Sequence, residues 1–205
     1  MSKLKSSRNK HSWINRLPFY ALGLGVIVSI FLMPVIIRLR MNSKLPYTQA
    51  TIKTNKGDFT LTFRSETPKT VANFIQLAKS DYYSGTRIHR VVNDLLIQGG
   101  DPFSRDLTKT ELWGKGGTGY IFDDELEPAD EMKAGSVAKV NNGPDTNGSQ
   151  FFILVSDASW LAGKHTLFAT VTSGLDVVKA ISILPSGLTG IPREEVVIQN
   201  ITLVP

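Results

Sequence analysis

The apolar and polar positions follow different patterns in residues 1–45 and in the rest of the chain. Leu17–Ile37 is a run of 21 residues without a charged side chain, and Arg16 and Arg38 flank it. A helix of this length rises about 30 Å, which matches the hydrocarbon core of a bilayer. The pattern therefore predicts a transmembrane helix over residues 17–37, between a short basic segment (1–16) and a linker (38–46).

Two other interpretations of this apolar run fit it less well. A cleaved signal peptide has a shorter apolar region, about 7–15 residues, and ends on small residues, whereas the polar stretch RLRMNSKLPYT follows here. A buried core helix is rarely apolar on all sides. Five basic residues precede the run and three follow it. The positive-inside rule then predicts a cytoplasmic N-terminus and an extracytoplasmic location for residues 47–205.

Residues 47–205 show the alternation that is typical of strands. Ala50–Thr54 and Phe59–Phe63 alternate around the turn Asn55–Asp58, which predicts a hairpin. Thr67 and Pro68 predict the N-cap and first turn of a helix. Further runs predict strands at Arg87–Val92, Leu95–Gln98, Ser136–Val140, Phe151–Val155, Leu167–Val171 and Val196–Val204, and a second helix at Leu175–Leu184. Many short strands with few helices predict a mainly β domain of the barrel type.

The positive charge of the chain is confined to its N-terminal part. Residues 1–45 hold eight of the 23 Lys and Arg residues and no acid, so residues 46–205 hold 15 basic and 18 acidic residues, a net charge of −3. The domain therefore lacks the basic surface of a nucleic-acid-binding protein. Cysteine is absent, which excludes disulfides and thiolate metal sites. The acidic run Asp123–Glu127 lacks EF-hand spacing and is interpreted as solvated surface.

Two stretches of the domain carry a specific resemblance. They read IHRVVNDLLIQGGD (88–101) and NNGPDTNGSQFFI (141–153), and WLAGKHTLFATV (160–171) follows the second. In content, order and spacing they resemble the signature of the cyclophilin family of peptidyl-prolyl cis–trans isomerases. The resemblance covers residues 47–205. It implies a closed, eight-stranded antiparallel barrel capped by two helices.

The resemblance also implies a groove that takes proline-containing polypeptides without a cofactor or metal. It gives Arg90 and Gln98 catalytic roles. It places at the substrate Leu95, Leu96, Asn141, Gln150, Phe152, Trp160, Leu161 and His165. Trp160 and His165 further imply binding of cyclosporin, and the glycine-rich stretch 114–119 is expected to form a loop beside the groove. Leu95 and Leu96 stand where the family usually has Phe and Met, so the pocket stays apolar but changes shape.

The chemistry of the reaction explains why an arginine is the central candidate. Rotation about an X-Pro bond crosses a barrier of about 18–20 kcal/mol because the amide must lose its resonance. No bond breaks, so a catalyst needs only to bind the twisted amide better than the planar one. The twisted prolyl nitrogen regains a lone pair, and the permanently charged guanidinium of Arg90 can donate to it. Gln98 is expected to hold Arg90 or the substrate carbonyl.

Two functions of other classes stay open from the sequence. The leucines at 95 and 96, with Val140 in place of a smaller residue, also suit a module that binds proline peptides with little turnover. A structural subunit of a membrane complex is the third interpretation. Within the site, Phe151 and Phe152 point to opposite faces of a strand, which predicts Phe151 in the core and Phe152 in the pocket. His89 is expected to support the barrel.

Overall fold

The computed structural model describes residues 46–205. The basic segment, the helix predicted over residues 17–37 and all but the last residue of the linker lie outside the described residues. Within residues 46–205, no helix combines the length and the apolar character needed to cross a membrane. The membrane anchor therefore stays a prediction, and the architecture below is that of the domain that follows it.

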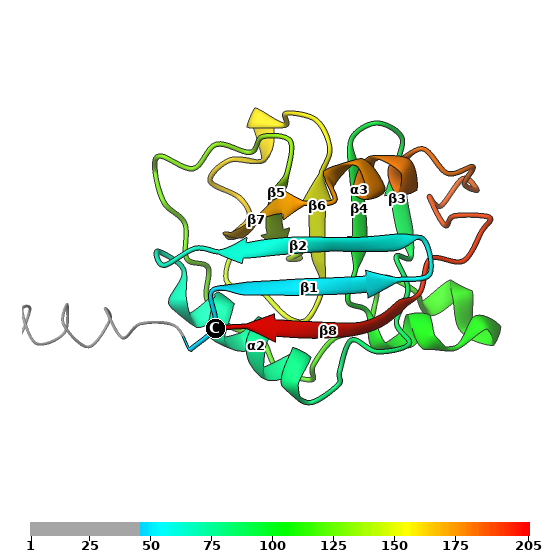
Figure 1. The fold of residues 1–205 in the computed structure, drawn as a ribbon, viewed down its shortest axis with the longest axis horizontal. Helices are drawn as coiled ribbons and strands as arrows, with labels where there is room; N and C mark the ends of the chain where they lie inside the picture. The colour runs from blue at the N-terminus through cyan, green and yellow to red at the C-terminus, as the bar shows by residue number, and fades with distance from the viewer. Residues whose placement is uncertain (1–45) are drawn as a thin grey trace, which may run out of the picture. The chain divides into compact units, whose positions relative to one another are not determined.

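Eight strands form one antiparallel sheet in the order β3-β4-β6-β5-β7-β2-β1-β8 (Figure 1). Side chains from all eight strands meet in a single core, so the sheet curves around one interior. The strands are β1 (Gln49–Thr54), β2 (Gly57–Phe63), β3 (Arg90–Val92), β4 (Leu96–Gly99), β5 (Ser136–Lys139), β6 (Phe151–Leu154), β7 (Leu167–Ser173) and β8 (Ile198–Val204). The predicted mainly β fold and all the predicted strands are confirmed.

The prediction of a closed barrel was wrong. Within the described residues, no ladder pairs the end strands β3 and β8. The segment just before β3 is hydrogen-bonded instead to the start of β8 and the residues before it: Ile88 N donates to Val196 O at 2.9 Å, and Ile198 N donates to Thr86 O at 2.8 Å. The fold is therefore a half-barrel whose open side is bridged by a few bonds. The edge of β3 that faces away from β4 is left to be covered by other parts of the chain.

Within the described residues, two α-helices lie against the sheet at different places. Helix α2 (Pro68–Lys79) packs against β7 and β8, and α3 (Leu175–Ser182) packs against β2, β3 and β4; Figure 1 shows them on opposite sides of the β1–β2 hairpin. Three short 3-10 turns were not predicted, because such turns are too short to show a periodicity. They are η1 (Pro102–Arg105), η2 (Leu107–Leu112) and η3 (Ser159–Leu161).

The first turn of α2 is capped from a distant segment. Thr67 occupies the N-cap position as predicted, but its side chain makes no capping hydrogen bond. The carboxylate of Glu125 accepts from the backbone N–H groups of Lys69 (3.1 Å) and Thr70 (2.8 Å) instead. A carboxylate at this end of a helix satisfies free N–H groups and complements the helix dipole. The interpretation of the acidic run as solvated surface was therefore wrong for Glu125.

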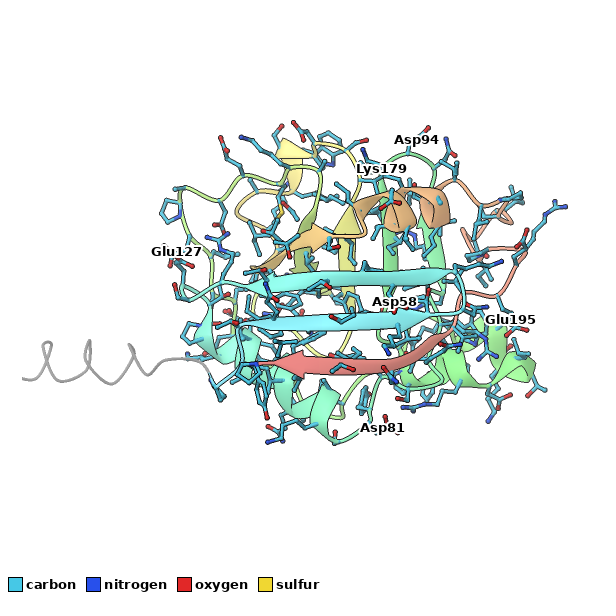
Figure 2. All side chains as sticks on the ribbon, in the orientation of Figure 1. Asp58, Asp81, Asp94, Glu127, Lys179 and Glu195 are labelled. Carbon is cyan, nitrogen blue, oxygen red and sulfur yellow. The ribbon has the colours of Figure 1, made fainter. Side chains whose placement is uncertain are left out.

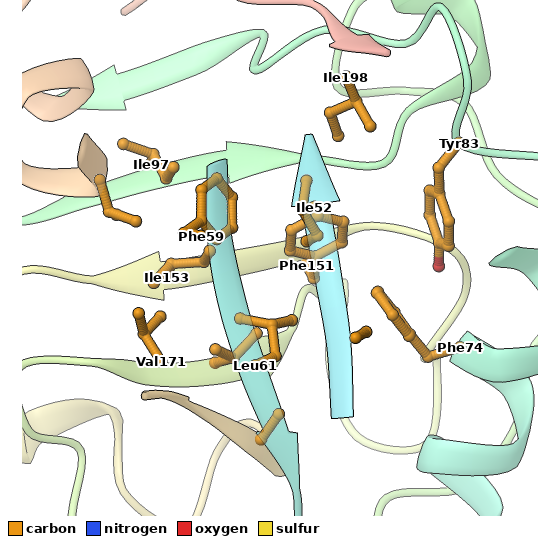
Figure 3. Close-up of a cluster of buried hydrophobic side chains, with 14 of the residues drawn as sticks. Ile52, Phe59, Leu61, Phe74, Tyr83, Ile97, Phe151, Ile153, Val171 and Ile198 are labelled. Carbon is orange, nitrogen blue, oxygen red and sulfur yellow. The ribbon is translucent and has the colours of Figure 1, made fainter. Parts of the chain in front are cut away.

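Apolar side chains fill the interior of the sheet. Phe59, Leu61 and Phe63 alternate inward along β2 as predicted, and all three are buried. Phe74 of α2 lies at the centre of an aromatic group, with ring centroids 5.1 Å from Tyr83 and 5.8 Å from Phe151. Figure 3 shows Phe151 among the side chains of the strands, with Phe74 and Tyr83 beside them. The core is thus closed at one end by the helix that Glu125 caps.

One charged residue, Lys139, occupies a position where the pattern of the core requires an apolar side chain. The charged residues labelled in Figure 2 are all exposed: Asp58, Asp81, Asp94, Glu127, Lys179 and Glu195. Lys139 on β5 is 0 % exposed, and its Nζ has no hydrogen-bond partner among residues 46–205. The rings of Phe122 and Phe168 lie 6.0 and 5.9 Å from this nitrogen. Burial lowers the pKa of Lys139 to about 7.

Candidate active site

The register of the sheet brings three of the predicted site residues, Arg90, Gln98 and Phe152, into one row. Arg90 on β3 pairs with Gln98 on β4, and Gln98 pairs with Phe152 on β6. Phe152 pairs in turn with Ala138 on β5. Directly paired residues of an antiparallel sheet point to the same face. Phe151 points into the core, as predicted, so the row lies on the outer face of β3, β4, β6 and β5, which we call the site face.

A chain of hydrogen bonds crosses the site face from Arg90. Its Nη1 donates to Gln98 Oε1 at 3.2 Å, and Gln98 Nε2 donates to Gln150 Oε1 at 2.9 Å. Gln150 Nε2 donates to the carbonyl oxygens of Gly114 (2.9 Å) and Gly116 (2.8 Å). In both glutamines the amide oxygen therefore faces Arg90, and the amide nitrogen faces away from it. The two buried glutamines connect the exposed guanidinium to the loop that begins at Gly114.

An apolar cluster lies next to this hydrogen-bonded chain. Leu96 and Phe152 are buried in it, and Leu95, Val140 and Leu161 pack against it while remaining partly exposed. This cluster is separate from the core inside the sheet, because alternate residues of β4, β5 and β6 point to opposite faces. The predicted proline-pocket residues therefore form one apolar surface beside an exposed arginine.

His165 borders the apolar cluster. Its ring stands perpendicular to that of Phe152, with centroids 5.2 Å apart. Its Nδ1 lies 3.1 Å from the carbonyl oxygen of Lys139, and a protonated Nδ1 donates this bond. Burial lowers the pKa of His165, although the bond to Lys139 opposes the shift. The imidazole is therefore neutral at pH 7, which suits a wall of the site rather than a source of charge.

A cavity of about 320 Å³ adjoins the row at Gln150. It is lined by the loop Gly114–Ile121 and by the segment Val140–Asn142. Asn141, a predicted substrate contact, lies in this lining, and its Nδ2 donates to Lys164 O at 2.8 Å. The prediction that the glycine-rich stretch forms a loop beside the site is confirmed. Gln150 lines the cavity and also belongs to the hydrogen-bonded series that starts at Arg90. The cavity and that series are therefore continuous.

Trp160 stands apart from the other predicted site residues, whereas His89 was expected to support the barrel and was not predicted in the site. Trp160 lies beside Leu161 on η3 and is 58 % exposed; within residues 46–205 no hydrogen bond or aromatic contact joins it to the other predicted residues. His89 is buried, and burial lowers its pKa, with the charge of Asp101 opposing the shift. A buried neutral imidazole agrees with the supporting role expected of His89.

Sequence reasoning missed two bulky residues that line the cavity. Tyr120 and Ile121 line it, and Ile121 is 66 % exposed. The Tyr120 hydroxyl accepts a 2.7 Å hydrogen bond from Asn73 Nδ2, which ties this loop to α2. The available signal was a pair of bulky apolar residues directly after a glycine-rich stretch, where neither strand nor helix periodicity accounts for them.

Comparison with known proteins agrees with this arrangement. Residues 49–203 match the family model described as cyclophilin type peptidyl-prolyl cis-trans isomerase/CLD. The chain belongs to the cyclophilin family. Among the relatives, peptidyl-prolyl cis-trans isomerase-like 1 of Neurospora crassa is 39 % identical over 159 residues, 77 % of this chain and 94 % of that protein. Peptidyl-prolyl cis-trans isomerase B of Streptomyces anulatus is 40 % identical over 174 residues, 75 % of this chain and 95 % of that protein.

Solved cyclophilins share the fold. The crystal structure of a cyclophilin type isomerase of Cryptosporidium parvum superimposes with a TM-score of 0.71 at 32 % identity, covering 78 % of this chain and 98 % of that one. A second structure of that protein, in the presence of the dipeptide Ala-Pro, gives a TM-score of 0.70 at 32 % identity, covering 77 % of this chain and 99 % of that one. The chain of residues 1–205 is therefore a peptidyl-prolyl cis–trans isomerase of the cyclophilin type, the activity that its sequence predicts.

Proposed function

We propose that Arg90 is the catalytic residue and that its guanidinium donates to the prolyl nitrogen of the twisted amide. The supporting observation is the 3.2 Å bond from Arg90 Nη1 to Gln98 Oε1, which holds an exposed cation beside a buried apolar surface. Gln98 is 9 % exposed and is itself held by Gln150. Positioned donors that need no reorganisation during the reaction stabilise a transition state more than mobile ones do.

The proline ring, in this proposal, sits on the apolar cluster. Leu96 and Phe152 form its floor, and Leu95 and Leu161 its rim. An apolar ring in this place excludes water, and the attraction between Arg90 and the prolyl nitrogen grows as the local dielectric constant falls. Asn141, Gln150, Trp160 and His165 then contact the polypeptide on either side of the proline. Cyclosporin would bind the same surface, with Trp160 as an exposed contact.

The required rate enhancement is larger than one hydrogen bond from Arg90 can provide. A barrier of about 20 kcal/mol gives a rate on the order of 0.01 per second, and turnover in milliseconds requires lowering it by about 6–7 kcal/mol. One charge-assisted hydrogen bond contributes ~1.5–3 kcal/mol. The remainder must come from tighter binding of the twisted substrate by the pocket and backbone contacts.

Replacing Gln98 with alanine tests the proposed support of Arg90. We expect kcat to fall roughly fivefold to tenfold while KM changes less, because the guanidinium loses its fixed acceptor but the apolar pocket remains. Exchange NMR on an Ala-Pro peptide with the full-length protein measures both. Asn93→Ala is the matched control, since this exposed amide bonds to Asp94 rather than to Arg90. An unchanged kcat in Gln98→Ala would contradict the proposal that Gln98 positions Arg90.

We further propose that the chain is held in a membrane by residues 17–37, with the isomerase domain on the extracytoplasmic side. The 21-residue uncharged run and the excess of basic residues before it support this. The clients would then be secreted or membrane proteins whose X-Pro bonds isomerise as they fold.

Two charges placed inside the apolar run should release the protein from membranes. Each charged residue at the centre of a membrane helix costs about 2.5–3.5 kcal/mol. We therefore expect wild-type protein to stay with the membrane pellet after alkaline washing and Val26→Asp/Ile30→Asp to move to the supernatant. Isomerase activity of the released variant should equal that of the wild type. Equal sedimentation of the two proteins would refute the anchor, and protease protection of the domain in sealed vesicles reports its side.

A further inference from the structure

The outer edge of β3 is covered by the loop of residues 185–193, which joins α3 to β8. This loop holds its own shape: Gly187 N donates to Ile191 O at 3.0 Å, and Gly190 N donates to Gly187 O at 2.9 Å. At its base, Arg193 N donates to Pro185 O at 2.8 Å. Figure 1 shows the loop in orange-red at the right of the domain. The 185–193 loop is therefore a hairpin-like turn held by its own backbone hydrogen bonds.

The contact of this loop with β3 is made by Gly190. Its carbonyl oxygen accepts a 2.8 Å hydrogen bond from Val91 N, which satisfies a backbone group that β4 leaves free. Gly190 has φ of +82°, and a Cβ there would lie 2.9 Å from Val91 O and 3.1 Å from Arg90 Cγ. The backbone of Gly190 thus lies directly against the aliphatic stem of Arg90.

Arg90 is consequently supported at two points. Gln98 binds its guanidinium on one side, and Gly190 abuts its stem on the other. The first support alone leaves the intermediate torsions of a long, exposed side chain free. We propose that Gly190 is a positioning residue of the isomerase: the absence of a side chain lets the 185–193 loop press on the Arg90 stem and aim the guanidinium at the prolyl nitrogen. This inference rests on the proposed catalytic role of Arg90.

Adding a methyl group at Gly190 tests the proposal. In the full-length protein we expect Gly190→Ala to lower kcat by roughly tenfold with KM changed less than twofold, because misplacing a reacting group by a fraction of an ångström costs about this much. Gly187→Ala is the matched control in the same loop, since a Cβ at Gly187 meets no described residue within 4 Å. It should keep wild-type kcat. Normal kcat in Gly190→Ala would overturn the inference.

Gly190→Asn separates the effect of a Cβ at this position from backbone strain. Asparagine tolerates a positive φ better than alanine does, but it carries the same Cβ. It should therefore fold more stably than Gly190→Ala, measured by thermal unfolding, and still show the loss of kcat. Recovery of full kcat in Gly190→Asn would assign the alanine effect to strain alone and overturn the proposal. The asparagine variant also supplies the activity measurement if the alanine variant does not fold.

A double-mutant cycle with Arg90→Ala decides whether Gly190 acts through Arg90. If it does, Gly190→Ala should cause no further loss of kcat once Arg90 is alanine, whereas a general structural effect would multiply the two losses. Multiplied losses overturn the proposal. If Arg90→Ala alone keeps full activity, the proposed role of Arg90 fails. If only Arg90→Ala is impaired, the role of Arg90 stands and the inference about Gly190 fails.

Discussion

Arg90→Ala should lower kcat/KM for an Ala-Pro peptide by roughly 10–150-fold, the equivalent of a lost charge-assisted hydrogen bond of ~1.5–3 kcal/mol. The loss should fall mainly on kcat, since this bond forms only when the prolyl nitrogen regains its lone pair. The apolar cluster of Leu96 and Phe152 is untouched, so peptide binding should persist. Exchange NMR reports rate and binding in the same sample.

Two further variants make the Arg90 measurement specific. Arg193→Ala removes an exposed arginine of the neighbouring loop and should leave the rate unchanged. Arg90→Lys keeps the charge but lacks the planar set of donors, so we expect it to recover only part of the lost activity. Wild-type activity in Arg90→Ala would contradict the assigned role. Peptide shifts without faster exchange in the wild type would instead favour a binding module.

Lys139→Met should raise the free energy of unfolding at pH 7 by roughly 3–5 kcal/mol. The lysine is fully buried, its Nζ has no hydrogen-bond partner within the described part of the chain, and two phenylalanine rings flank it. Burial lowers the pKa of Lys139 from 10.5 to about 7, and each unit of such a shift is worth about 1.4 kcal/mol. Methionine fills a similar volume without a charge to desolvate.

The same substitution should flatten the dependence of stability on pH. Because the folded-state pKa lies below the unfolded one, the unfolded chain binds more protons between pH 7 and 10.5, and stability rises with pH in that window. Below pH 7 the full cost of charging Lys139 is present. Urea unfolding at pH 7, 8 and 9 should give a midpoint that rises with pH for the wild type. The midpoint of Lys139→Met should rise less, because residue 139 no longer titrates. His165, whose pKa is also lowered, titrates below this window.

The exposed Lys53 on β1 provides the control for this stability measurement. Lys53→Met should change stability at pH 7 by less than about 0.5 kcal/mol, as surface substitutions usually do, and should keep the wild-type slope with pH. If Lys139→Met is no more stable than Lys53→Met, the amine of Lys139 must have a favourable partner in solution, and its burial does not weaken the fold.

Some features of this protein follow from local sequence and were predicted correctly. The alternation of Phe59, Leu61 and Phe63 determines which face of β2 is buried, and adjacency alone separates Phe151 from Phe152. Such periodicities express the geometry of a strand and need no knowledge of its partners. The signature stretches predicted the site residues by resemblance, and the register of β3, β4 and β6 brings Arg90, Gln98 and Phe152 together.

Other features depend on segments that are distant in sequence, and only the tertiary structure decided them. Glu125 caps a helix more than 50 residues before it, and Gly190 meets Arg90 across a gap of about a hundred residues. The inward lysine at 139 could be suspected from its register with Val137, but its lack of a partner could not. Local patterns fix which face a residue occupies, whereas partners across the fold are fixed by how the strands pair and where the loops land. The sequence by itself therefore determined the family and the strands and helices of the sheet, and it predicted the site residues; the tertiary structure decided what holds those residues in place.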